Sequence, residues 1–155
     1  GCNCFQTMGS GIAKSISDRY PAAFVADMAT EYGTRDKLGS FSFADVEGPR
    51  RIYNLYTQFR YGRDRQHAEP WAILQSLLAM RQSLESYDLT DIKIGLPLIG
   101  CGLGGADWNE VGPLVSQAMD GLDVTIFSLG SKLEAASIIK ARLSHHMSSL
   151  TKNTV

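Results

Sequence analysis

The sequence predicts a layered α/β domain, and three observations support this prediction. Segments with apolar residues at helical spacing alternate with short strand-like segments. Two of the short segments, 92–99 and 124–129, are almost wholly apolar, as expected for strands covered on both faces. Glycine-rich turns separate strand-like from helix-like segments. Strands that alternate with helices in this way favour a sheet flanked by helices.

The length and composition are those of an ordinary globular protein. The 155 residues are 44% hydrophobic and 20% charged, and they fit one domain, which we expect to span 1–155. The net charge of −1 gives no overall attraction to nucleic acid, so we do not expect a nucleic-acid partner. No apolar run reaches the roughly 18 residues that cross a bilayer. Three cysteines do not indicate a disulfide framework, which favours a cytoplasmic protein.

Two helices and two strands are predicted in the first part of the chain. Residues 9–20 and 21–32 carry apolar side chains at helical spacing. The second helix carries Phe24, Val25 and Met28. Residues 40–46 and 51–57 are typical of strands joined by a tight turn at 47–49.

A long helix is predicted to begin at Pro70, a residue favoured at the first helical position. Its apolar face consists of Ile73, Leu74, Leu77, Leu78 and Leu84. The spacing of Asp107 and Glu110 matches a capping box, which predicts a further helix that Pro113 should kink or delay. A last helix and a tail are expected over 131–155.

Two glycine-rich segments, 8–11 and 100–105, each lie directly before a predicted helix. Glycines let backbone amides approach a ligand, and a helix start presents unpaired N–H groups with a partial positive charge. Such loops bind phosphate without a lysine. Two of them at one edge of a sheet would suit a diphosphate, although glycines in tight turns alone would explain the same residues.

Other chemistries are weakly supported by the residue pattern. The second loop has the GxGxxG spacing of dinucleotide-binding folds, but the next strand ends in 127–129 without the acidic residue that holds the ribose. The cysteines and the histidine pair at 145–146 match no zinc spacing, so we expect neither a metal nor a cofactor. His67 lies in a polar segment, where a solvated histidine is the common case.

Asp107 follows the second glycine-rich segment directly. Its carboxylate could act on a molecule bound by that segment as a general base. It could equally cap the helix that starts there. The sequence leaves both roles open.

Three ordered motifs resemble the macro domain family, in particular its branch with ADP-ribose-1″-phosphate phosphatases and bacteriophage proteins. The motifs are residues 1–13 followed by Tyr20-Pro21, residues 52–63, and residues 96–108, and the resemblance extends to about Leu129. It implies a three-layer α/β/α sandwich with a mixed, mostly parallel sheet. It also implies that two further strands, with the aspartate that holds adenine, precede Gly1. A phage-like protein of this kind would work in the host cytoplasm.

The resemblance implies ADP-ribose, or its 1″-phosphate, as the ligand, and an ADP-ribosylated protein as a further partner. Asn3 would bind the distal ribose. The first loop would line the ribose and the diphosphate with Gly9, Ser10, Gly11 and Ile12. The second would surround the diphosphate with the amides of Gly100, Cys101, Gly102, Leu103 and Gly104.

The same resemblance implies a hydrolase that removes a group from the distal ribose, with Asp107 as the catalytic candidate and ADP-ribose 1″-phosphate as the expected substrate. Members that cleave ADP-ribosyl esters have a lysine and an aspartate where this chain has Gln58 and Gly104. We therefore do not expect a covalent lysine mechanism. A module that binds ADP-ribose without chemistry, an ADP-ribosyl ester hydrolase, and a scaffold that contacts RNA or protein remain as alternatives.

Overall fold

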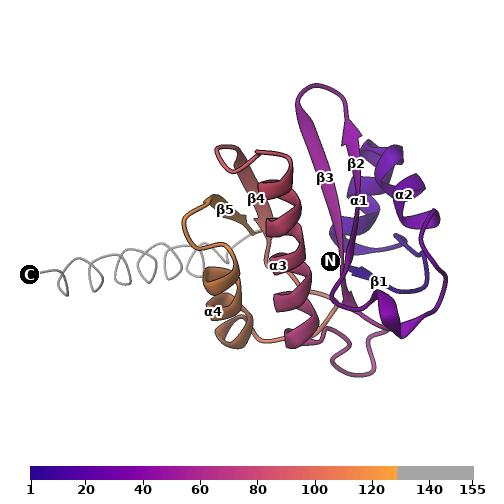
Figure 1. The fold of residues 1–155 in the computed structure, drawn as a ribbon. Helices are drawn as coiled ribbons and strands as arrows, with labels where there is room; N and C mark the ends of the chain where they lie inside the picture. Colours follow the sequence, from indigo (N-terminus) through magenta and orange to yellow (C-terminus); the bar gives the residue numbers. More distant parts are fainter. Residues whose placement is uncertain (129–155) are drawn as a thin grey trace, which may run out of the picture.

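The computed structural model describes residues 1–128, which form two sheets with helices on both sides (Figure 1). The strands are β1 (Cys2–Asn3), β2 (Phe41–Val46), β3 (Arg50–Gln58), β4 (Lys93–Pro97) and β5 (Asp123–Phe127). The helices are α1 (Gly11–Arg19), α2 (Pro21–Met28), the 3₁₀ turn η1 (Arg35–Lys37), α3 (Pro70–Ser86) and α4 (Trp108–Ala118). The expected last helix and tail over 131–155 lie outside the described residues.

The strands pair in both directions. In one sheet β3 lies between β1, to which it is parallel, and β2, to which it is antiparallel; Phe41 is opposite Leu55. In the other sheet β4 and β5 are parallel, with Lys93 opposite Asp123. The predicted mixed, mostly parallel pairing is therefore confirmed.

Side chains of β3 alternate between two helical layers. Asn54 donates to the carbonyl of Ala23 in α2, and the Tyr56 hydroxyl donates to Asp27 in the same helix. On the opposite face, the Tyr53 hydroxyl lies 3.0 Å from the Ser83 hydroxyl of α3. Because successive strand residues point to opposite faces, this pattern places α2 and α3 on the two sides of the sheet. The prediction of three α/β/α layers is confirmed.

The main hydrophobic core lies between α3, α4 and the strands. Ile73 and Leu77 of α3 are fully buried, as is Val111 of α4, and Leu84 is 1% exposed. Of the predicted apolar face, Ile73, Leu77 and Leu84 are buried, and Leu74 and Leu78 are half-buried against the same core, so the predicted helix is confirmed. Pro113 lies inside α4, which starts at Trp108, so this proline does not delay the helix, and the alternative of a kink stays a prediction.

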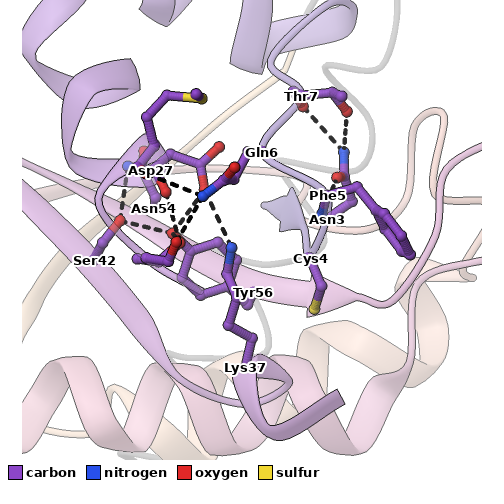
Figure 2. A network of polar contacts seen from close by, with 12 residues as sticks. Asn3, Cys4, Phe5, Gln6, Thr7, Asp27, Lys37, Ser42, Asn54 and Tyr56 are labelled. Atoms are coloured by element: carbon purple, nitrogen blue, oxygen red, sulfur yellow. Dashed lines mark hydrogen bonds and ion pairs between the residues drawn. The ribbon is translucent and has the colours of Figure 1, made fainter. Parts of the chain in front are cut away.

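Helix α2 buries an acidic residue and exposes apolar ones. Val25 is 65% exposed and Met28 is 50% exposed, whereas Asp27 is fully buried. Its carboxylate accepts a 2.8 Å hydrogen bond from Tyr56 and lies 3.6 Å from the ammonium group of Lys37 (Figure 2). A buried charge is retained only with such partners.

A cleft of about 960 Å³ lies between the two sheets and is lined mainly by β3, β4 and α1. Ile94 and Leu96 of β4 are buried, but Lys93 and Gly95 are exposed. In β5, Phe127 is 62% exposed. The prediction that these strands are covered on both faces is therefore wrong for the described residues.

Candidate functional site

The first glycine loop, residues 3–11, connects β1 to α1 and is shaped by Asn3. The Asn3 side-chain amide donates to the backbone carbonyl and the hydroxyl of Thr7, at 3.0 and 2.8 Å. Its oxygen accepts a 2.8 Å bond from the backbone N–H of Phe5. Asn3 is 7% exposed, and Figure 2 shows it turned inward toward Thr7. A bond from this amide to a ribose, as expected from the sequence, would have to replace one of the bonds to Thr7.

The first turn of α1 presents free N–H groups. Ser10 is the N-cap residue, but its side chain caps no backbone group. The first helical bond runs from the N–H of Lys14 to the Ser10 carbonyl. Within residues 1–128, the N–H groups of Gly11, Ile12 and Ala13 donate to no acceptor. Unpaired amides at a helix start form a site of partial positive charge.

The second glycine loop, residues 100–106, connects β4 to α4 and folds on itself. The N–H of Ala106 donates to the Gly100 carbonyl and that of Gly105 to the Gly102 carbonyl. Three successive N–H groups, those of Gly102, Leu103 and Gly104, have no acceptor among the described residues. Gly102 and Leu103 are also exposed. Successive free amides of this kind form an anion-binding concavity.

The two loops lie next to each other. A Cβ atom at Gly11 would lie 3.4 Å from Cδ1 of Leu103, and Gly11 has a φ of +58° that favours glycine. A Cβ at Gly104 would lie only 2.7 Å from the Gly100 carbonyl oxygen, so the second loop requires glycine at this position. The structure thus brings the sequence-predicted loop residues together, although their ligand stays a prediction.

The segment between β3 and α3 supports the second loop. The N–H groups of His67 and Ala68 both donate to the Gly104 carbonyl, at 2.9 and 3.0 Å. The His67 side chain is only 7% exposed, and its Nε2 lies 2.8 Å from a carboxylate oxygen of Asp64. That hydrogen bond lowers the pKa of the Asp64 carboxyl. The expectation of a solvated His67 is therefore wrong.

Asp107 caps α4. One of its carboxylate oxygens accepts hydrogen bonds from the backbone N–H and the side-chain amide of Asn109, at 2.9 and 3.1 Å. The residue is exposed at the end of the second glycine loop. Of the two roles left open by the sequence, the cap is confirmed, and the catalytic role stays a prediction.

Gln58, at the end of β3, is placed beside the second loop. Its side-chain oxygen would lie 3.1 Å from a Cβ at Gly104, and its amide donates to the Arg60 carbonyl. The two positions that the family resemblance linked are therefore neighbours in space.

Other sequence-based expectations concern metals, thiols and membranes. Within residues 1–128, no group of histidine, cysteine and acidic side chains could hold a metal ion. Burial raises the pKa of Cys2 and raises that of Cys4 to about 11. Neither thiol is therefore ionised at neutral pH. Among the described residues, no helix is long and apolar enough to span a membrane.

Comparisons with known proteins identify relatives in phages and bacteria. No family model matches the chain. The chain is 32% identical over 130 residues to an uncharacterized 17.5 kDa protein of Enterobacteria phage T4, with 81% of each chain covered. It is 30% identical over 112 residues to a DNA ADP-ribosyl glycohydrolase of Mycobacterium tuberculosis, covering 70% of this chain and 30% of the relative.

The fold agrees with these relatives. A macrodomain protein from Streptomyces coelicolor superposes with a TM-score of 0.64 at 25% identity, and the match covers 83% of this chain and 84% of the other. The layered architecture and the paired glycine loops predict the same assignment. The chain belongs to the macro domain family.

Proposed function

We propose that this macro domain binds the ADP-ribosyl group and hydrolyses the bond between its distal ribose and a substituent. One observation carries the proposal, namely that two neighbouring loops each present free backbone amides. These amides belong to Gly11, Ile12 and Ala13 in the first loop and to Gly102, Leu103 and Gly104 in the second. Such an arrangement attracts negative charge, which supports an anionic ligand.

A diphosphate matches this arrangement. Its two negative charges would face the N-terminus of α1 and the three amides of the second loop, and hydrogen bonds to charged groups contribute about 1.5–3 kcal/mol each. No lysine or arginine is needed for this binding. Binding energy at the diphosphate would then hold the distal ribose in place for attack by water.

We expect water to be the attacking group, because Gln58 cannot act as a nucleophile and Asp107 could activate a water molecule. The carboxamide of Gln58, which lies beside Gly104, is not a nucleophile, so no covalent lysine intermediate forms at this position. Asp107 is the nearest predicted base at the end of the second loop. It would take a proton from the water, an effect of about 10²–10⁴ in rate.

The substrate class is the finer part of the proposal. ADP-ribose 1″-phosphate, which the family resemblance implies, is the first candidate. An ADP-ribosyl group on DNA is the second candidate, and the similarity to a DNA ADP-ribosyl glycohydrolase favours it. The chain spans less than a third of that relative, so the relative's substrate comes to this chain only as a proposal.

Calorimetry with ADP-ribose, followed by two turnover assays, tests this function. We expect one-to-one binding, and then either phosphate release from ADP-ribose 1″-phosphate or release of ADP-ribose from an ADP-ribosylated oligonucleotide. Binding without turnover of either substrate would support the alternative of a binding module and overturn the hydrolase. Absence of binding would overturn both.

A further inference from the structure

Five residues form a surface cluster beside the first glycine loop, which we call the aromatic–arginine face: the exposed Tyr32, Arg35 and Arg60 and the half-buried Phe5 and Phe59. Phe5 is at its centre, with its ring 5.4 Å from the Tyr32 ring at an interplanar angle of 88° and 5.0 Å from the Phe59 ring at 65°. Figure 2 shows Phe5 pointing away from the buried Asp27 network. We propose that this face binds single-stranded nucleic acid.

Two guanidinium groups lie over the rings, and no carboxylate neutralises their charge. Arg35 lies 4.2 Å from the centre of the Phe59 ring, and Arg60 lies 5.4 Å from that of Phe5. Both arginines are exposed, and no ion pair among residues 1–128 includes either of them. Their positive charges therefore remain available to an anion.

In a second aromatic cluster of this protein, the arginine over the rings is paired with a carboxylate. Arg51 lies over the rings of Phe43 and Tyr87, at 4.2 and 4.6 Å. However, both ends of its guanidinium donate to Asp45, at 2.6 and 3.0 Å, and its side chain is only 16% exposed. The charge of Arg51 is paired inside the molecule, whereas the charges of the aromatic–arginine face are not.

The face is preformed by hydrogen bonds between three segments. The side-chain amide of Gln6 donates to the carbonyls of Met28 and Thr30. The N–H of Gly33 donates to the Cys4 carbonyl, and the N–H of Cys4 donates to the Phe59 carbonyl, at 2.8 and 3.1 Å. Little conformational entropy would be lost when a ligand binds to such a surface.

An exposed ring next to unpaired guanidinium groups matches the chemistry of a single strand. Tyr32 is 66% exposed, so an unpaired base can stack on it. Arginine binds phosphate and also stacks on bases. A duplex does not offer free base faces, and an acidic peptide would use the charges without the rings. The balanced net charge, which argued against nucleic acid from the sequence, does not reveal this local arrangement.

The aromatic–arginine face lies near the site of the proposed function, and the inference rests on that function. The face contains Phe5 of the first glycine loop, and Arg60 lies in the segment whose His67 supports the second loop. A strand on the face would therefore lie beside two segments that shape the proposed site. This position favours an ADP-ribosyl group carried by nucleic acid over the free 1″-phosphate.

Fluorescence anisotropy of the full chain with a labelled thymidine oligonucleotide tests the inference. We expect Tyr32→Ala and Arg60→Ala each to weaken binding about tenfold, with Arg60→Ala also reducing the slope of affinity against salt by about one. Tyr87→Ala is the matched control, because this tyrosine is 54% exposed beside the paired Arg51, and we expect no change.

Three outcomes would overturn the inference: no binding of the oligonucleotide, equal affinity of the wild type and both face variants, or equal displacement by duplex DNA or by polyglutamate. A uridine oligonucleotide in parallel distinguishes DNA from RNA, and binding of either strand supports the face. Calorimetry with ADP-ribose on the wild type separates the two proposals. ADP-ribose binding without oligonucleotide binding overturns only the face, and the reverse overturns only the proposed function.

Discussion

Gly11 and Leu103 are neighbours, although they belong to different glycine loops: a methyl group at Gly11 would be 3.4 Å from Cδ1 of Leu103. This proximity puts the free amides of α1 and those of the second loop at one place. An anion larger than a single phosphate can therefore bind to both sets of amides at once. The proposed ADP-ribose site depends on this relationship.

Gly102→Val should block the site without damaging the fold. A Cβ at Gly102 meets nothing within 4 Å, so the larger side chain occupies the space in front of the free amides rather than the protein interior. We expect ADP-ribose affinity to fall at least about tenfold, a loss of about 1.4 kcal/mol, while the melting temperature stays unchanged. Calorimetry and thermal unfolding measure the two quantities. Unchanged affinity would exclude Gly102 from the site.

Substitution of Asp107 separates its two roles. Asp107→Asn keeps an N-cap residue but removes the base, whereas Asp107→Ala removes both. We expect both variants to lose turnover about 10²-fold or more, and only Asp107→Ala to lose about 1 kcal/mol of the free energy of unfolding. Full activity of Asp107→Asn would show that the residue is only a cap.

The buried pair of Asp27 and Lys37 should be strongly coupled. Lys37→Met leaves the fully buried carboxylate of Asp27 without its cation, so we expect a loss of about 3–5 kcal/mol in the free energy of unfolding. The double variant Asp27→Asn, Lys37→Met should lose less than the sum of the single variants. Chemical denaturation of the four proteins measures the coupling, and strictly additive losses would contradict it.

Alkaline pH should destabilise the protein through Cys4. Burial raises the pKa of this thiol from 9.0 to about 11, so the folded protein keeps the proton while the unfolded chain loses it. The free energy of unfolding should therefore decrease as the pH rises from 9 toward 11, and the thiol contributes no pH dependence well below 9. The decrease should be shallower in Cys4→Ala. Identical pH profiles of the wild type and this variant would contradict the assignment.

The sequence predicted those features that local chemistry controls. Pro70 and the leucine spacing predicted α3 because both act within one helix. The glycine loops were predicted because each precedes a helix start, where unpaired amides occur in any fold. In the same way, the spacing of Asp107 and Glu110 predicted the start of α4 at Trp108.

The features that could not be predicted from the sequence depend on contacts between segments that are far apart in the chain. Asp27 is buried in α2 because Tyr56 and Lys37, from distant segments, meet its carboxylate, and no local pattern shows this. The solvated environment expected for His67 was wrong because its segment folds against Gly104. The aromatic–arginine face likewise joins Phe5, Tyr32 and Phe59 from three separate parts of the chain.

Amide NMR during an ADP-ribose titration tests the central claim most directly, because it observes the proposed donors themselves. The account predicts that the largest shifts of amide protons occur at Gly11 and Ile12 in the first loop and at Gly102, Leu103 and Gly104 in the second, and that both groups saturate together. Shifts confined to one loop, or largest shifts elsewhere in the molecule, would contradict a diphosphate held between the two loops.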